Sequence, residues 1–189
     1  MGRWQPDSRG RLQEAALALY SERGFDQTTA AEIAARAGLT ERTFFRHFAD
    51  KREVLFGGSA LLQERIVAGV IGAPPDDGPL DAVAGGLTAA AAMLGEFRRD
   101  LSRQRQAVIT ANPELREREL AKLADYAVAV AGALHRRGVA EPQATLAAEA
   151  GMTVFRIAVE RWASGQDDCD LADVMRDSLA GLRAVAGGD

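Results

Sequence analysis

Apolar residues recur along the chain at the three- and four-residue spacing of amphipathic helices. In the first such stretch, 9–23, one face collects the apolar side chains Leu12, Ala15, Ala16, Leu19 and Tyr20. No run of β-branched residues alternates with polar ones as in a strand. Interruptions by Gly and Pro separate further helical stretches at about 30–37, 41–47, 51–71, 80–99, 101–111, 114–137, 142–164 and 171–185. The pattern predicts an all-α protein of about nine helices.

The densest local pattern lies between residues 28 and 55. Thr29 and Glu32 have the spacing of a capping box, which predicts a helix start near residue 30. Gly38 falls at the turn after this helix, where a left-handed backbone conformation favours glycine. Thr40 is placed to cap the next short helix. Two short helices around a glycine turn are typical of a helix-turn-helix DNA reader, with a plain helical hairpin as the alternative.

A further helix is predicted directly after this reader. Asp50 and Glu53 have the spacing of a second capping box, so we expect a connecting helix over about 51–71. It ends before the linker sequence GAPPDDGP at 72–79. The sequence therefore predicts two domains. Residues 1–56 would form the DNA-binding domain, with helices at about 9–23, 30–37 and 41–47, and 57–189 a helical ligand-binding and dimerisation domain.

Charge is divided unevenly along the chain. Residues 1–56 carry 9 Lys and Arg against 8 Asp and Glu, a net charge of +1, whereas residues 57–189 carry 14 against 19, a net charge of −5. Within 36–52, five basic residues accompany only two acidic ones. Positive charge therefore collects on the predicted reader, and the acidic remainder suits a body that stays off the duplex.

Catalytic and metal-binding chemistry is not indicated. The single cysteine, Cys169, excludes an internal disulfide and a multi-cysteine metal site. His47 and His135, the two histidines, do not have the spacing of a ligand pair. Without a nucleophile–base pair or a glycine-rich phosphate loop, we expect neither an enzyme nor a bound cofactor. No signal peptide or long apolar run is found, so we expect a cytoplasmic protein that does not contact a membrane.

The short helix at 41–47 would be the recognition helix. Its first turn carries Arg42 and Thr43, and Arg46 follows one turn later. An arginine can donate two hydrogen bonds to the O6 and N7 atoms of guanine in the major groove. The polar surface of this helix therefore fits direct reading of base pairs.

The neighbouring residues divide between core and DNA contact. Phe44 and Phe48 are four residues apart and suit the core, whereas Phe45 is expected on the DNA side. Thr28 and Thr29, at the start of the preceding helix, could cap that helix and also bind a phosphate. We expect the DNA-contacting residues to be Thr28, Thr29, Thr40, Arg42, Thr43, Phe45, Arg46, His47 and Lys51.

The segment from Arg9 to Phe56 resembles the DNA-binding domain of the TetR (tetracycline repressor) family of bacterial transcription regulators. The resemblance is carried by the helix ending ALALYSERGF and by TTAAEIAARAGLTERTFFRHFADKREVLF. It implies an all-helical homodimer that binds a double-stranded DNA operator and is usually released from it by a small molecule. The positions that match DNA-contacting places in the family are Thr28, Thr29, Arg42, Thr43, Phe45, Arg46, His47 and Lys51. Phe45 departs from the family, which most often has Tyr there.

The C-terminal helices predict two further surfaces. Those at about 142–164 and 171–185 are apolar around more than half their circumference, which favours a homodimer interface over a larger core in one chain. A ligand pocket is expected between the connecting helix and the helices at 80–99, 114–137 and 142–164. Its candidate lining residues are Met93, Phe97, Val108, Tyr126, Met152, Phe155, Arg156 and Trp162. The apolar ones also suit a plain core, and Arg156 could instead be solvated.

These patterns together favour a ligand-responsive transcriptional regulator that binds a palindromic operator as a dimer. The abundance of Ala and Met near the expected pocket favours a largely apolar effector. Repression is the expected outcome because it is usual in the family that the DNA-binding segment resembles. The alternatives are an activator of the same fold, or a helical ligand-binding dimer that does not read DNA.

Overall fold

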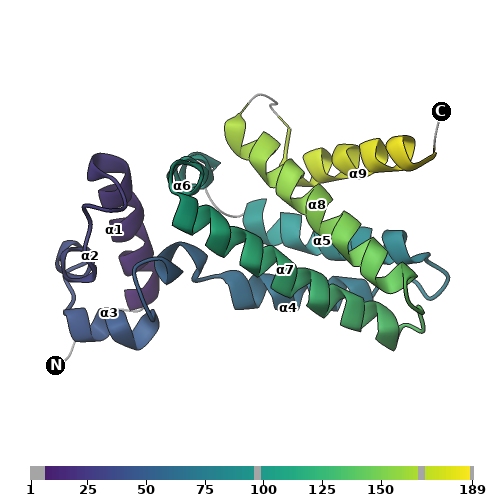
Figure 1. Ribbon diagram of the computed structural model, residues 1–189, viewed down its shortest axis with the longest axis horizontal. Helices are drawn as coiled ribbons and strands as arrows, with labels where there is room; N and C mark the ends of the chain where they lie inside the picture. The colour runs from purple at the N-terminus through teal and green to yellow at the C-terminus, as the bar shows by residue number, and fades with distance from the viewer. Residues whose placement is uncertain (1–6, 96–98, 166–168, 188–189) are drawn as a thin grey trace. The chain divides into compact units, whose positions relative to one another are not determined.

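The computed structural model describes residues 7–95, 99–165 and 169–187 of the chain. Every regular element in these residues is a helix, so the predicted all-α fold is confirmed (Figure 1). The elements are α1 (Ser8–Arg23), α2 (Ala30–Arg36), α3 (Glu41–His47), the short 3-10 helix η1 (Glu53–Phe56), α4 (Ser59–Ile71), α5 (Pro79–Gly95), α6 (Arg99–Ala111), α7 (Pro113–Arg136), α8 (Gln143–Ser164) and α9 (Leu171–Gly187).

The chain divides into two compact units. The reader unit consists of Met1–Gly58 together with Gln104–Glu119, and the body unit consists of Ser59–Arg103 together with Leu120–Asp189. The reader unit therefore includes the end of α6 and the start of α7, which the sequence placed in the second domain. Two long-range contacts account for this. Arg105 donates a hydrogen bond of 2.9 Å to the backbone carbonyl of Leu55, and Arg118 pairs with Glu53.

Local capping starts the two helices of the motif as the sequence predicts. The Thr29 side chain accepts a bond from the backbone N–H of Glu32, and the Glu32 carboxylate accepts one from the backbone N–H of Thr29. The Thr40 hydroxyl accepts a bond of 3.2 Å from the backbone N–H of Thr43. Gly38 has a φ of 66°, the left-handed conformation expected at the turn. The capping box of Thr29 and Glu32, the cap at Thr40 and the turn at Gly38 are thus confirmed.

The aromatic residues of α3 divide between core and surface as predicted. Phe44 is fully buried and Phe48 is 4% exposed, while Phe45 is 52% exposed. The rings of Phe44 and Phe48 lie 5.7 Å apart between centroids. Burial of these two rings anchors α3 and turns Phe45 outward.

The prediction of one continuous connecting helix over 51–71 is wrong. Asp50 accepts bonds from the backbone N–H groups of Arg52 and Glu53, as a cap does. Only the short η1 follows it, and α4 begins at Ser59. Two causes are visible. Gly57 and Gly58 are poor helix formers, and the three consecutive residues before them are all buried, which one face of an α-helix cannot achieve: Val54, Leu55 and Phe56.

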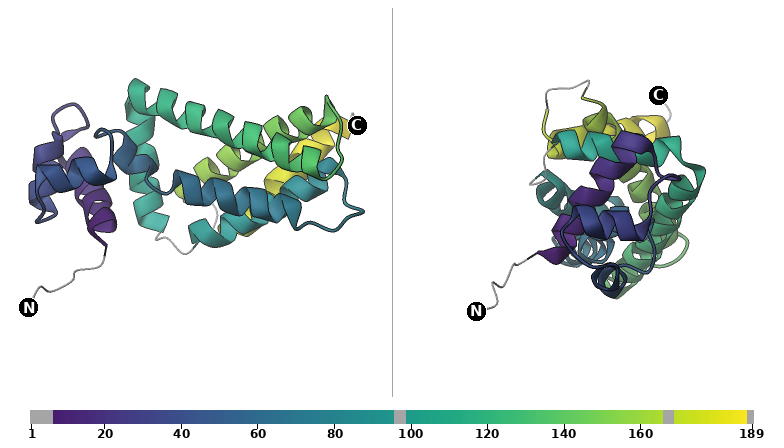
Figure 2. Two further views of the ribbon diagram at one scale, coloured as in Figure 1. Left: turned by 90° about the horizontal axis from the view of Figure 1, so that it is seen from below. Right: turned by 90° about the vertical axis from the view of Figure 1, so that its left-hand side faces the viewer.

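In the body unit α5 packs on α4, α8 and α9 (Figure 2). The contact between α4 and α5 is close because glycines face each other. A Cβ added at Gly86 would lie 2.7 Å from the carbonyl oxygen of Ile66, and one added at Gly69 would lie 2.8 Å from that of Gly85. The two backbones thus approach more closely than larger side chains allow.

One stretch among the described residues, Glu53–Ile71, which comprises η1 and α4, is long and apolar enough to cross a membrane by length and composition. The chain interrupts this stretch at Gly57, between η1 and α4. Ile66 and Val70, in its second half, are fully buried in the core of the body unit. Core packing therefore accounts for part of its apolar composition, while Leu61 and Ile71 of the same stretch remain exposed.

Candidate nucleic-acid interface

The outer face of α3 carries two arginines that no residue described by the structure engages. Arg42 and Arg46 are exposed, and neither forms a hydrogen bond or ion pair with any residue that the structure describes. The half-exposed ring of Phe45 lies on the same short helix. Each guanidinium group keeps its planar set of N–H donors available for a guanine edge or a phosphate.

The other basic residues near the motif are engaged inside the reader unit. Arg36 donates two bonds to Glu22, at 3.0 and 2.7 Å, and these bonds lower the pKa of the Glu22 carboxyl. Arg52 pairs with Asp50 at 2.7 Å. Partial burial acts to raise the pKa of Asp50, but the bonds from Arg52 and from the backbone outweigh it and lower this pKa. Among the residues that the structure describes, the five basic residues of 36–52 thus contribute chiefly Arg42 and Arg46 as unpaired cations.

Four further predicted DNA contacts differ in their access to solvent. Thr29 and Thr40 are exposed at the starts of α2 and α3, while Thr43 and His47 are partly buried. The hydroxyls of Thr40 and Thr43 lie 3.0 Å apart. The Nε2 atom of His47 is buried, and no described residue forms a hydrogen bond with it. A contact between His47 and DNA would therefore use its other ring nitrogen.

Thr28 requires a correction, because the structure leaves its side chain no access to DNA. The residue is fully buried, and its hydroxyl donates a bond of 2.9 Å to the carbonyl of Gly24. The sequence pattern of two successive threonines at a helix start does not distinguish the buried one from the cap. Thr29 remains the exposed member of the pair.

Lys51 also has a role that the sequence did not predict. Its ammonium group donates bonds to the backbone carbonyls of Phe25, at 2.9 Å, and Thr28, at 3.1 Å. It lies 4.2 Å from the centroid of the Phe25 ring. A phosphate contact by Lys51 would require this group to leave acceptors that it already has.

Arg9 and Arg11 of α1 support the motif, a role that the sequence did not predict for them. Arg11 donates to the carbonyl of Ala37, at the turn between α2 and α3. Arg9 donates to the carbonyl of Gly57 and lies 5.4 Å from the centroid of the Phe48 ring. No local pattern distinguishes these arginines from solvated charge, because their acceptors lie far away in the sequence.

The residues predicted to line a ligand pocket are only partly brought together. Four of them are buried in one hydrophobic cluster of the body unit: Tyr126, Met152, Phe155 and Trp162. Met93 is partly buried, and Phe97 lies outside the described residues. Arg156 instead pairs with Glu160, one turn along α8, at 3.1 Å. The apolar members remain candidates for the effector site.

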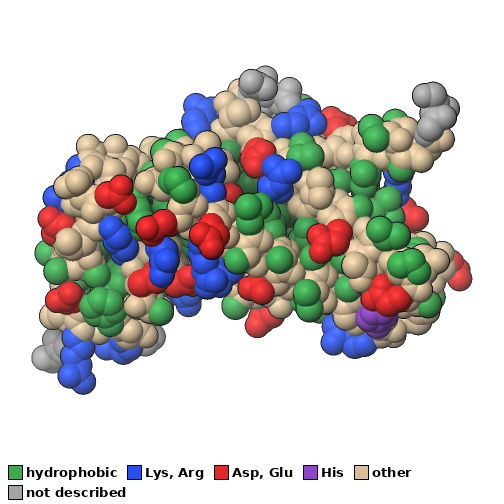
Figure 3. Space-filling view, in the orientation of Figure 1, with side chains coloured by type: hydrophobic (Ala, Val, Ile, Leu, Met, Phe, Trp, Pro, Cys, Tyr) green, Lys and Arg blue, Asp and Glu red, His purple; other side chains and the backbone are tan. Residues whose placement is uncertain are grey.

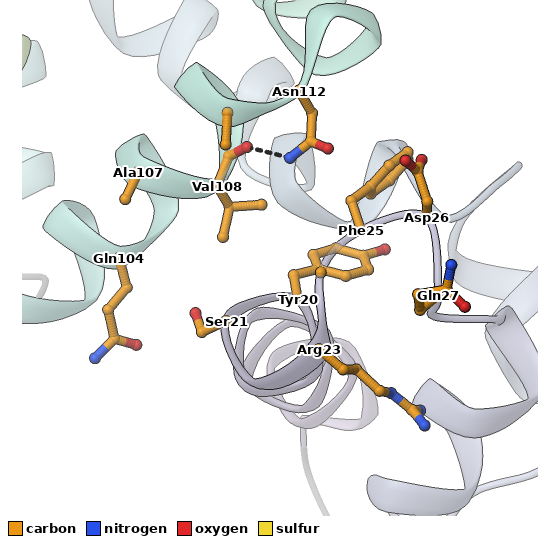
Figure 4. A pocket seen from close by; sticks show the side chains of 12 residues that line it. Tyr20, Ser21, Arg23, Phe25, Asp26, Gln27, Gln104, Ala107, Val108 and Asn112 are labelled. Atoms are coloured by element: carbon orange, nitrogen blue, oxygen red, sulfur yellow. Dashed lines mark hydrogen bonds between the residues drawn. The ribbon is translucent and has the colours of Figure 1, made fainter.

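Val108 belongs to the reader unit rather than to the body cluster, which corrects its predicted place. It lies on α6 and helps to line an open pocket of about 580 Å³. Side chains of α6 face the end of α1 and the following loop across this pocket (Figure 4). Asn112 closes the end of α6 by donating a bond of 2.6 Å to the carbonyl of Val108.

Metal-binding clusters are not found among the described residues, where no three side chains from His, Cys, Asp and Glu converge. Cys169 is exposed. The two ring nitrogens of His135 lie 3.0 Å from the carbonyl oxygen of Val139 and 3.0 Å from a carboxylate oxygen of Glu141, both of which are hydrogen-bond acceptors.

Comparison with known proteins places both units in one family. Residues 12–56 match the profile described as bacterial regulatory proteins, tetR family. Residues 66–187 match the profile described as the MftR C-terminal domain.

Individual proteins agree with these profiles. The chain is 35% identical over 91 residues to the HTH-type transcriptional regulator TcmR of Streptomyces glaucescens, covering 48% of this chain and 39% of that protein. It is 43% identical over 47 residues to the HTH-type transcriptional repressor KstR2 of Mycobacterium tuberculosis, covering 25% of this chain and 24% of that protein. The matches thus span less than half the length of these relatives.

Solved structures extend the likeness to the whole fold. The SmeT–triclosan complex has a TM-score of 0.62 with 22% sequence identity, over 94% of this chain and 90% of that one. At this identity the likeness concerns the fold alone. Because one profile spans the reading helices and the other spans more than half of the chain, this protein belongs to the TetR family of bacterial regulatory proteins.

Proposed function

We propose that this protein is a transcriptional repressor that binds a palindromic DNA operator as a homodimer and is released by a small, largely apolar molecule. The observation that carries the proposal is the outer face of α3. There Arg42 and Arg46 remain unengaged among the described residues while the neighbouring cations are paired. Free guanidinium groups beside an exposed aromatic ring suit the edges of base pairs and the phosphates around them.

Reading of DNA would begin with α3 in the major groove. Its seven residues span about 10 Å, short enough to enter the groove with the first turns facing the bases. Arg42 and Arg46 would donate to guanine or phosphate, and Phe45 would contact a sugar or a thymine methyl group. Thr40 and Thr29, exposed at the two helix starts, would bind the flanking phosphates. Operator binding would place the protein in the cytoplasm.

Dimerisation through α8 and α9 would bring two readers to one operator. These helices pack on each other and still expose large apolar side chains: Leu146, Ile157 and Val185. Hydrophobic side chains also reach the surface of the body unit among charged ones (Figure 3). Apolar side chains at helix surfaces are stabilised by burial against a second copy.

The effector would bind in the body unit near the buried cluster of Tyr126, Met152, Phe155 and Trp162. Aromatic and Met side chains line sites for apolar molecules, because they bury such ligands at little polar cost. The structural neighbour SmeT is seen with triclosan, and KstR2 is a repressor by name. Both facts support an apolar effector and repression for this chain.

A gel-shift assay on the DNA upstream of the protein's own gene tests the reading function. The wild-type protein should give a discrete shift. Arg42→Ala and Arg46→Ala should each weaken the free energy of DNA binding by about 1–3 kcal/mol. Arg36→Ala is the matched control, because Arg36 lies outside α3 and is paired with Glu22. If no genomic fragment gives a sequence-selective shift, the proposal is wrong. Equal losses in all three variants would also contradict the assignment of α3.

A further inference from the structure

Lys51 connects the C-terminal end of α3 to the loop between α1 and α2. It lies three residues beyond Phe48, the C-cap of α3. Its ammonium nitrogen is 2.9 Å from the carbonyl oxygen of Phe25, 3.1 Å from that of Thr28 and 3.5 Å from that of Asp26. An ammonium group has three N–H donors. Its hydrogen-bonding capacity is therefore used on the backbone of one loop.

The backbone of Lys51 is held as well. The Tyr20 hydroxyl, near the end of α1, donates a bond of 2.6 Å to the carbonyl of Lys51. Burial raises the pKa of the Tyr20 phenol, and the negative charge of Asp50 raises it further. The hydroxyl thus remains protonated and able to donate. The rings of Tyr20 and Phe25 pack edge to face with centroids 5.2 Å apart.

Thr28 fixes the loop from its other side. Its buried hydroxyl donates to the carbonyl of Gly24, while its own carbonyl accepts from Lys51. Thr28 directly precedes Thr29, the N-cap of α2. We use the term Lys51 clasp for Lys51, Tyr20, Phe25 and Thr28 with these contacts. The clasp ties together the end of α1, the start of α2 and the exit of α3.

We propose that Lys51 is a positioning residue for the DNA-reading surface rather than a phosphate contact. This inference rests on the proposed DNA-binding function. The turn at Gly38 and the cap at Thr40 fix the start of α3, and the clasp fixes its exit. With both ends held, α3 presents Arg42 and Arg46 at a set angle to α2. Without the clasp, the exit of α3 can shift and the two guanidinium groups lose their alignment.

The geometry requires lysine at this position. Three carbonyl oxygens approach one nitrogen atom, which suits a compact ammonium group with rotatable donors. A guanidinium group spreads its donors over a rigid plane and would need more space beside the Phe25 ring. A phosphate contact has the opposite preference, because arginine binds phosphate at least as well as lysine does. Lys51→Arg therefore separates the two roles.

Affinity for random DNA also distinguishes a positioning residue from a phosphate contact. A lysine that contacts a phosphate contributes about equally to every sequence, so its loss weakens operator and random DNA alike. A positioning residue acts on base reading, so its loss weakens the operator selectively. The measurement uses an operator duplex recovered with the wild-type protein and a random duplex of equal length. Affinities are taken at a temperature at which circular dichroism shows every variant folded.

The variants are Lys51→Met and Lys51→Arg, with Arg52→Met as the matched control. Arg52 is adjacent and exposed, pairs with Asp50, and its replacement removes the same single charge. Both Lys51 variants should lose about tenfold in operator affinity while keeping random-duplex affinity within about twofold. Arg52→Met should lower both affinities by one common small factor.

Three results would overturn the inference. They are a wild-type operator affinity in Lys51→Arg, equal losses of affinity for both duplexes in Lys51→Met, and a Lys51→Met protein whose melting temperature falls while its operator affinity is unchanged. If Lys51→Met does not fold, Tyr20→Phe replaces it, because this change removes only the hydroxyl bond to Lys51. That variant should lose operator affinity selectively by about threefold, and an unchanged affinity would count against the clasp. A wild-type protein that binds no operator would instead refute the proposed function.

Discussion

Phe45 lies on the proposed DNA-reading surface, at a position where we expect most proteins of the resembling family to have Tyr. Its ring is 52% exposed and packs edge to face on the fully buried Phe44, with centroids 5.3 Å apart. The buried ring holds the exposed one in place, so the outward edge of Phe45 has a defined position. A phenol hydroxyl at that edge would meet solvent rather than the core.

Phe45→Tyr is expected to tighten operator binding by about 0.5–1.5 kcal/mol, because it adds one hydrogen-bond donor for a phosphate without crowding the core. Operator affinity of the two proteins under identical salt measures the effect. Phe44→Tyr is the control: the same hydroxyl placed in the fully buried position should lower the melting temperature and give no gain in affinity. An affinity of Phe45→Tyr equal to the wild type would show that the ring edge does not approach a phosphate.

Residue roles in the reader are divided by pairing rather than by charge alone. Arg36 and Arg52 have carboxylate partners, and Lys51 has backbone acceptors. Arg42 and Arg46 carry the same charge but keep their donors free among the described residues. The sequence shows five cations close together, and only the contacts show which of them are available to DNA.

At the scale of elements, the pair α4 and α5 depends on glycine. A Cβ at Gly86 would lie 2.7 Å from the carbonyl oxygen of Ile66 and 2.8 Å from a methyl carbon of Val70. The first neighbour is backbone, which cannot move without displacing α4. The close approach is therefore a property of the two helices together and not of either alone.

Gly86→Ala should destabilise the body unit by about 1–3 kcal/mol, because the added methyl group forces the two helices apart. Denaturant unfolding followed by circular dichroism gives the change in free energy. Gly132→Ala is the matched control in α7, where an added Cβ has nothing within 4 Å. That change should stabilise by about 0.5–1 kcal/mol through helix propensity alone. A Gly86→Ala protein at least as stable as the wild type would mean that α4 can shift freely on α5.

At the scale of the whole molecule, the apolar surface of α8 is what the proposed dimer would bury. Leu146 and Ile157 are 64% and 39% exposed, and their eleven-residue spacing returns to nearly the same side of a helix after three turns. Val128 of α7 is 75% exposed but belongs to neither of the two proposed interface helices. The chain thus offers an apolar test position inside the expected interface and one outside it.

Leu146→Arg should convert the dimer into a monomer, because a buried unpaired charge costs more than the interface contact stabilises. Size-exclusion chromatography with light scattering measures the mass. Operator affinity should fall by about a hundredfold as the two half-sites are no longer read together. Val128→Arg is the control and should leave both mass and affinity unchanged. A dimeric Leu146→Arg protein would place the interface elsewhere.

The sequence by itself determined what depends on neighbours three or four residues apart. These features are the helices, the capping box of Thr29 and Glu32, the turn at Gly38, and the division of Phe44 and Phe48 from Phe45. Each follows from backbone geometry and side-chain periodicity within one or two turns. The same local pattern carries the resemblance to the family, which the comparisons confirm.

Only the tertiary structure decided what depends on partners far along the chain. Arg105 and Arg118 reach Leu55 and Glu53 across 50 and 65 residues and bring the corner between α6 and α7 into the reader unit. Packing of that kind buries Val54, Leu55 and Phe56 together and leaves η1 where one long helix was predicted.

Thr28 and Lys51 show, within the proposed site, the same limit of prediction from local sequence. A threonine at a helix start and a lysine beyond a recognition helix both look available to DNA in the sequence. In the fold, the Thr28 hydroxyl bonds to Gly24 and the Lys51 ammonium to the loop before α2. Local spacing records which donors the chain carries, whereas long-range folding decides which acceptors they meet.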